Sequence, residues 1–129
     1  MIILRINTHS GVPPYLQIVQ QVKQDIRMGL LKEGDKLPTV QEAVTMTAIN
    51  PNTVFKAYRE LESRGLVEGR AGIGTFVLKH PAGPSPSTQK TLTKDLADWI
   101  DSAYKAGLDD ESAEALFHIT LRNSKKETM

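Results

Sequence analysis

Polar side chains that can bind nucleic acid recur at helical spacing in the segment after Asn50. At about 100° per residue, Asn52, Lys56 and Arg59 fall on one arc of a helix. Their amide and cationic groups can reach base edges or phosphates, and the hydroxyl group of neighbouring Thr53 suits a phosphate. This spacing therefore favours contact with a nucleic-acid groove.

The helix that would carry these side chains has clear ends. Asn50 is a suitable N-cap, and Pro51 suits the first helical position because its missing amide would have had no partner. Gly65 suits a left-handed helix end, so we expect a helix over residues 51–64. Phe55 lies toward the polar arc, where two interpretations stay open: contact with a thymine methyl group, or cover for the preceding helix or a neighbouring chain. The opposite arc carries the side chains expected to pack inward, which are Val54, Ala57, Tyr58 and Leu61.

A glycine-tipped hairpin is expected next. Residues 66–70 and 75–79 have the composition of short strands, and the glycines between them suit a tight turn. Arg70 at the tip is placed to reach a phosphate or the minor groove, which would make residues 70–75 a DNA-binding wing. A nucleotide-binding loop is disfavoured because such a loop opens a helix.

Two more helices are expected before residue 50. Thr39 and Glu42 have the spacing of a capping box, so a helix begins there and ends near Ala48. A short turn then leads into the helix over 51–64, which is the helix-turn-helix arrangement. An earlier helix opens at Pro13-Pro14 with an apolar core stripe and, on its other side, Gln17, Gln20, Gln21 and Gln24. Residues 1–6 are expected to form a strand.

Short motifs keep fixed distances from one another over about residues 11–79: Pro14-Tyr15, Gln17-Ile18, Gly34, Leu37-Pro38-Thr39, Asn50-Pro51-Asn52-Thr53-Val54, Ala57-Tyr58, Leu61, Gly65-Leu66-Val67 and Gly72-Ile73-Gly74-Thr75-Phe76-Val77. This pattern resembles the GntR family of bacterial transcriptional regulators, and the short remaining tail resembles its YtrA-type subfamily. The resemblance implies a winged-helix domain that binds a two-fold operator as a homodimer, usually as a repressor.

The resemblance also implies a set of DNA-binding residues. Many members have Arg where this chain has Gln41, so that contact is expected to be weaker or to read a different base. Ala43 and Thr47 stand where larger apolar residues are usual, which implies thinner packing under their helix. Ala48 stands where a turn glycine is common. Carried over by position, the DNA-binding residues are Thr39, Gln41, Asn50, Asn52, Thr53, Lys56, Arg59, Arg70 and Gly72.

Charge and composition divide the chain of 129 residues. Residues 1–80 carry ten Lys/Arg and seven Asp/Glu, net +3, whereas residues 81–129 carry six and eight, net −2. The basic part is the one expected to bind DNA. We expect a mainly α fold with a small β-hairpin wing: a winged-helix domain over 1–79, a Pro/Ser-rich linker over 80–91 and a helical hairpin over 92–129.

The hairpin is expected to join two copies of the chain. Thr93 would cap its first helix, Gly107 would end it and Asp109 would start the second. Two helices of this length cannot bury their apolar side chains alone. Trp99 either packs in a two-fold bundle or lines a small-molecule pocket, and any effector is expected at a junction between domains or subunits. The residues expected at the dimer interface are Leu96, Trp99, Ile100, Leu116, Phe117 and Ile119.

Other classes of function find little support in the sequence. The chain has no Cys, and the spacing of His9, His80 and His118 does not suggest a metal site. We expect no cofactor, and no carboxylate pair or Ser/His/Asp set indicates an enzyme. The apolar first residues are too short for a signal or membrane segment, which favours a cytoplasmic protein. The alternative is a winged-helix module that binds protein instead of DNA.

Overall fold

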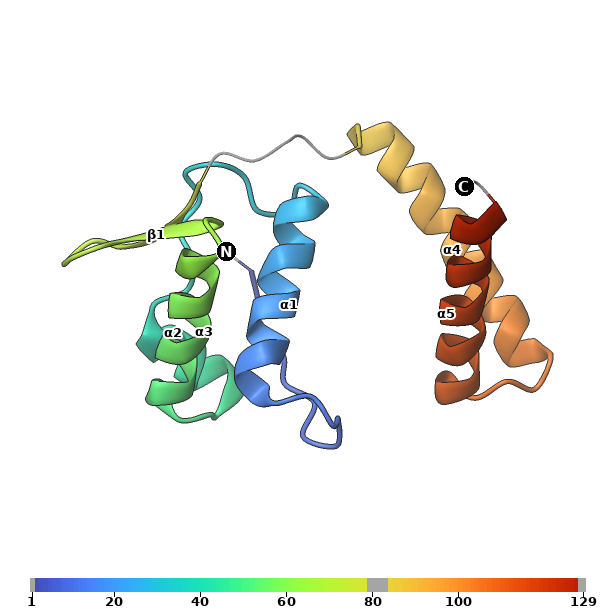
Figure 1. The fold of residues 1–129 in the computed structure, drawn as a ribbon, viewed down its shortest axis with the longest axis horizontal. Helices are drawn as coiled ribbons and strands as arrows, with labels where there is room; N and C mark the ends of the chain where they lie inside the picture. Colours follow the sequence, from blue (N-terminus) through green and yellow to red (C-terminus); the bar gives the residue numbers. More distant parts are fainter. Residues whose placement is uncertain (1, 79–83, 128–129) are drawn as a thin grey trace. The chain divides into compact units, whose positions relative to one another are not determined.

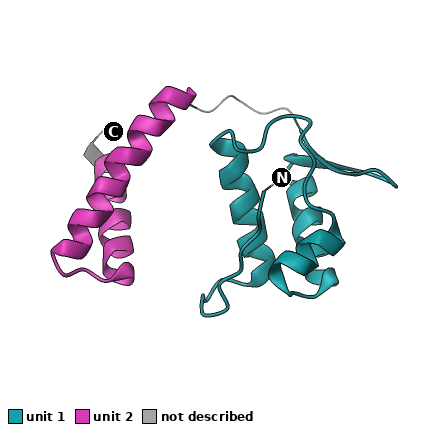
Figure 2. Cartoon of the chain, turned by 180° about the vertical axis from the view of Figure 1, so that it is seen from behind, with its two compact units in different colours: residues 1–84 teal, residues 85–129 magenta. Residues whose placement is uncertain are grey.

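The computed structural model describes residues 2–78 and 84–127, and the chain forms two compact units that meet in sequence at Pro84 (Figures 1 and 2). Unit 1 contains helices α1 (Pro14–Arg27), α2 (Val40–Thr47) and α3 (Pro51–Ser63), and strands β1 (Val67–Arg70) and β2 (Gly74–Val77). Unit 2 contains helices α4 (Pro86–Lys105) and α5 (Asp110–Glu127). The prediction of a mainly helical fold with one small hairpin is therefore confirmed. None of the described helices combines the length and apolar character needed to cross a bilayer.

The core of unit 1 lies between α1 and α3, which pack side by side, with α2 against α3 (Figure 1). The apolar stripes predicted for α1 and α3 supply it. Side chains with no exposed surface are Ile18, Val19, Val22, Ala43, Val54, Ala57 and Leu61. On α2 only Ala43 is fully buried, while Val40 and Val44 are partly buried.

Helices α2 and α3 of unit 1 begin at the positions that their capping residues predict. The Thr39 hydroxyl accepts a hydrogen bond from Glu42 N at 3.1 Å, and Glu42 Oε1 accepts one from Thr39 N at 2.9 Å. Asn50 Oδ1 accepts from Asn52 N at 2.8 Å, and Pro51 opens α3. Helix α3 ends at Ser63, one residue before the predicted end. Ala48 makes the turn between α2 and α3 with a left-handed φ of 58°, a conformation that glycine adopts with less strain.

The wing is an antiparallel pair in which Val67 faces Val77 and Arg70 faces Gly74. A third extended segment flanks β2, because Leu37 N donates to Thr75 O at 2.9 Å and Val77 N donates to Asp35 O at 2.8 Å. The hairpin is thereby fastened to the segment that precedes α2.

The prediction of a strand over residues 1–6 is wrong for the described residues. Residues 2–7 run extended without a strand partner, and glutamine side chains of α1 take that role. Gln21 accepts from Arg5 N at 3.0 Å and donates to Arg5 O, while Gln17 accepts from Asn7 N at 2.8 Å and donates to Asn7 O at 3.0 Å. Gln17 is therefore buried instead of lying on a solvated face.

The predicted start of the tail also needs correction. Helix α4 begins at Pro86, so residues 86–91 of the predicted linker are helical. Ser85 caps it by accepting from Thr88 N at 3.3 Å, whereas Thr93 lies inside the helix and its hydroxyl donates to Gln89 O at 2.7 Å. A proline suits the first position of a helix as well as a linker, which is why composition alone misled here. Residues 80–83 of that linker lie outside the described residues.

Candidate nucleic-acid interface

Helix α3 presents one buried and one exposed face. Asn52, Lys56 and Arg59 are exposed and Thr53 is half-buried, while the inward arc contacts the core. The Tyr58 hydroxyl donates to Pro38 O at 2.6 Å in a buried position, which fastens α3 to the residue before the Thr39 cap. The polar arc therefore lies on a helix whose opposite face is fixed to the core and to Pro38.

The two cations of α3 keep their charge available. In the part of the chain that the structure describes, neither Lys56 nor Arg59 has a carboxylate partner within 4.0 Å. Lys56 Nζ instead lies 4.1 Å from the centroid of the Tyr15 ring. Phe55, on the same side, is 50% exposed, so its ring remains available to DNA or to a neighbouring chain.

The wing and the start of α2 share one shallow depression of about 550 Å³, lined by Thr39 and residues 69–75. Arg70 lies there with its guanidinium carbon 4.7 Å from the centroid of the Phe76 ring and its Nη2 3.5 Å from Glu68 Oε2. Gly72 at the tip is exposed with a φ of 74°. Gln41 is exposed in the first turn of α2, and hydrogen bonds from the Thr39 amide and hydroxyl groups lower the pKa of Glu42 in the same turn.

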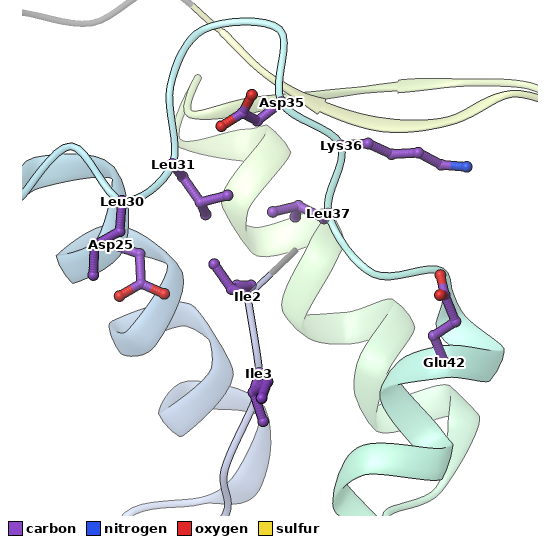
Figure 3. Close-up of a pocket in the computed structure, with 9 residues that line it drawn as sticks. All are labelled: Ile2, Ile3, Asp25, Leu30, Leu31, Asp35, Lys36, Leu37 and Glu42. Atoms are coloured by element: carbon purple, nitrogen blue, oxygen red, sulfur yellow. The ribbon is translucent and has the colours of Figure 1, made fainter.

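A separate depression of about 840 Å³ lies between the N-terminal segment, the end of α1 and residues 35–37 (Figure 3). Its carboxylates include Asp25, whose pKa is raised by burial, together with Asp35 and Glu42. Among the described residues of this lining, Lys36 is the one cation. Because carboxylates repel phosphates, this depression is unsuited to DNA.

The apolar residues predicted to join two copies lie on α4 and α5. Leu96, Leu116, Phe117 and Ile119 are between 40% and 46% exposed, and Trp99 and Ile100 are half-buried. Leu96, Trp99, Ile100 and Phe117 line a groove of about 280 Å³ between the two helices. Within unit 2 only Ala103 and Ala113 are buried among the described side chains.

No group of three potential metal ligands occurs among the described residues. His9 and His118 belong to different units, and His80 lies outside the described residues.

Comparison with known proteins places this architecture in a family. Residues 14–77 match the profile described as bacterial regulatory proteins, gntR family. The HTH-type transcriptional repressor YtrA of Bacillus subtilis (strain 168) is 39% identical over 109 residues, which are 84% of each chain. The chain belongs to the GntR family. It is therefore a DNA-binding transcriptional regulator and not an enzyme.

Solved structures agree with this GntR assignment. YtrA from Sulfolobus acidocaldarius, described as a GntR-family transcription factor, has a TM-score of 0.57 and 29% identity, covering 78% of this chain and 99% of its own. The DNA-binding domain of AraR in complex with operator ORX1 has a TM-score of 0.51 and 30% identity, covering 56% of this chain and 89% of its own.

Sequence reasoning did not assign roles to the aromatic rings beside the cations, or to Glu68. Tyr15 belonged to the motif pattern, but nothing local indicates that it meets Lys56, which is 41 positions away. Phe76 faces Glu68 across the hairpin, and Arg70, two residues further along β1, reaches the Phe76 ring diagonally; an alternating strand pattern could have suggested that contact.

Proposed function

We propose that this GntR-family chain is a homodimeric repressor that places α3 in the major groove of an inverted-repeat operator and the wing, residues 70–75, on the backbone or minor groove. The observation that carries the proposal is the exposed arc of Asn52, Lys56 and Arg59 on a helix whose other face is buried in the core. The likeness to the AraR domain solved with its operator supports it. The proposed contact residues are the Thr39, Gln41, Asn50, Asn52, Thr53, Phe55, Lys56, Arg59, Arg70 and Gly72 of the sequence prediction.

Local placement of charge matters more here than total charge. Residues 1–80 have a net charge of only +3. Affinity for DNA rises with the number of phosphates that cations neutralise. Binding must therefore depend on the few exposed cations at the interface, Lys56, Arg59 and Arg70, and on two subunits acting together.

The proposed dimer follows from unit 2. A two-helix hairpin that leaves most of its large apolar side chains 40% or more exposed has not buried enough surface to be stable alone. The same hairpin of a second chain has the matching apolar face and would close a two-fold bundle. Two copies of α3 would then meet half-sites about one DNA turn apart, roughly 34 Å.

DNA binding is tested by selecting fragments of genomic DNA with the full chain and titrating the selected duplex at several salt concentrations. Lys56→Ala and Arg59→Ala should weaken binding, and a lost phosphate contact should lower the slope of log affinity against log salt by about 0.9. Lys94→Ala is the matched control, because it removes an equal charge from unit 2. Failure of the wild-type chain to retain any fragment at low salt would leave the protein-binding winged helix as the better interpretation.

The dimer is tested by sedimentation velocity. Leu96→Asp and Phe117→Asp should give monomers and weaken operator binding, because each puts a charge into the apolar face. Lys94→Asp, on the polar side of α4, is the control that should stay dimeric. A wild-type monomer at the concentrations used for DNA binding would contradict the proposal.

An effector, where one acts, is proposed to bind at a junction between domains or subunits and to shift the spacing of the two α3 helices. Trp99 is the only Trp, so its fluorescence can report ligand binding as well as dimer packing. Metabolite screens in which neither this signal nor operator affinity changes would point to control by protein level. A DNA partner implies a cytoplasmic location.

A further inference from the structure

The ammonium group of Lys56 lies on an aromatic ring. Its Nζ is 4.1 Å from the centroid of Tyr15, inside the range of about 6 Å at which a ring face attracts a cation. Tyr15 belongs to the first turn of α1, outside the segments that supply the proposed DNA contacts. The contact therefore connects α1 with the polar arc of α3.

Tyr15 and Lys56 both lie on helices that pack against each other. Helices α1 and α3 lie side by side (Figure 1) and share one buried core, and Tyr15 is half-buried against that core. Because neither residue is on a loop, the ring keeps its place relative to α3.

The contact restrains Lys56 without neutralising it. Arg70, by comparison, lies near the carboxylate of Glu68 as well as on the ring of Phe76. Tyr15 carries no net charge, and an ammonium group has three N–H donors, of which a ring face occupies only one side. Lys56 stays exposed and can donate to a phosphate while it remains on the ring.

We propose that Tyr15 is a positioning residue for DNA binding: its ring holds the Lys56 ammonium at the place where it meets an operator phosphate. This inference rests on the proposed function above. An unrestrained lysine loses much side-chain freedom when it binds, and a lysine already held by a ring loses less. The ring thus raises affinity without contacting DNA itself.

The test is a double-mutant cycle on the full chain, with the duplex that the wild-type protein selects from genomic DNA. The four proteins are wild type, Tyr15→Leu, Lys56→Met and the double variant. Tyr15→Leu should weaken binding about two- to fivefold when Lys56 is present, which corresponds to the strength of an exposed cation–ring contact. It should have no effect when position 56 is Met.

Tyr15→Phe is the matched control, because it keeps the ring and removes only the hydroxyl group; its affinity and salt slope should equal those of the wild type. Circular dichroism checks that each variant folds. Equal weakening by Tyr15→Leu in both backgrounds would overturn the inference, because Tyr15 would then act through the fold or by its own contact. Tighter binding by Tyr15→Leu would also overturn it, since the ring would be withholding Lys56 from DNA. Absence of DNA binding by the wild type would instead remove the proposed function, and this inference with it.

Discussion

The buried hydrogen bond from Tyr58 to Pro38 allows a direct test of how much the attachment of α3 contributes to folding stability. The Tyr58 hydroxyl donates to Pro38 O at 2.6 Å, Tyr58 is 7% exposed and Pro38 is fully buried. Tyr58→Phe keeps the ring and removes the donor, so the Pro38 carbonyl is left in the core without its partner. An unsatisfied buried carbonyl costs about 1–3 kcal/mol of folding stability. For a unit of this size, each kcal/mol corresponds to about 4–8 °C in melting temperature.

Tyr104→Phe is the matched control. Its hydroxyl also donates at 2.6 Å, to Asp110 Oδ1, but Tyr104 is 49% exposed, so water can replace the lost partner. The expected change is within about 0.5 kcal/mol. The two variants lose the same hydroxyl group from hydrogen bonds of the same length, so a difference between their losses of stability reports the effect of burial.

The assay is denaturant unfolding at neutral pH followed by far-UV circular dichroism, with Trp99 fluorescence following unit 2 separately. Burial and then the Glu42 charge raise the pKa of Tyr58 above its usual 10.0. A raised pKa means that the contribution is present below pH 10 and is lost as pH rises through the folded value, so the donor is intact at neutral pH. Equal losses for Tyr58→Phe and Tyr104→Phe, or a loss below about 0.5 kcal/mol for Tyr58→Phe, would refute the argument.

Three further predictions use the described contacts. Hydrogen bonds from Thr39 lower the pKa of Glu42 from 4.5, so the stabilisation by the Glu42 carboxylate is present above pH 4.5 and is lost as pH falls through the folded value. Glu42→Gln should therefore reduce the dependence of the melting temperature on pH over that acidic range. Ala48→Gly should stabilise unit 1 by about 0.5–1 kcal/mol in denaturant unfolding, because it relieves the strain of a left-handed φ of 58°. Ala106→Gly is the control: Ala106 has a φ of −80°, so this change should not stabilise unit 2. Glu68→Gln should tighten operator binding in a fluorescence-anisotropy titration, because it removes a carboxylate that lies 3.5 Å from Arg70; unchanged or weaker binding would count against a role of Arg70 at DNA.

Signals confined to a few neighbouring residues were sufficient to predict most of unit 1. The Thr39 capping box, the Asn50 cap with Pro51, and the turn glycines of the wing each act within about one turn of backbone, so they can be read without knowing the fold. The buried arc of α3 follows from helical period for the same reason.

The errors and omissions arose where a distant segment decides the outcome or where a local signal suits two structures. The almost continuous apolar run of residues 1–6 suits a strand, but among the described residues no strand pairs with it, and the side chains of Gln17 and Gln21 bind its backbone instead. Proline-rich composition predicted a linker where Pro86 opens a helix. In the candidate site, the ring under Lys56 comes from α1, and sequence spacing cannot show a contact made by packing of two helices.

The helix caps explain why structural signals and proposed DNA contacts fall on the same residues. The Thr39 hydroxyl accepts from Glu42 N and gives its own proton to the Glu42 carboxylate, so a phosphate would have to compete with that carboxylate for the proton. Asn50 Oδ1 accepts from Asn52 N, which leaves the amide hydrogens of the Asn50 side chain as donors. A helix N-terminus also carries partial positive charge and unpaired amide groups that attract phosphate. Asn50, which caps its helix through its oxygen, can therefore bind a phosphate through its side-chain amide hydrogens, and neither role weakens the other.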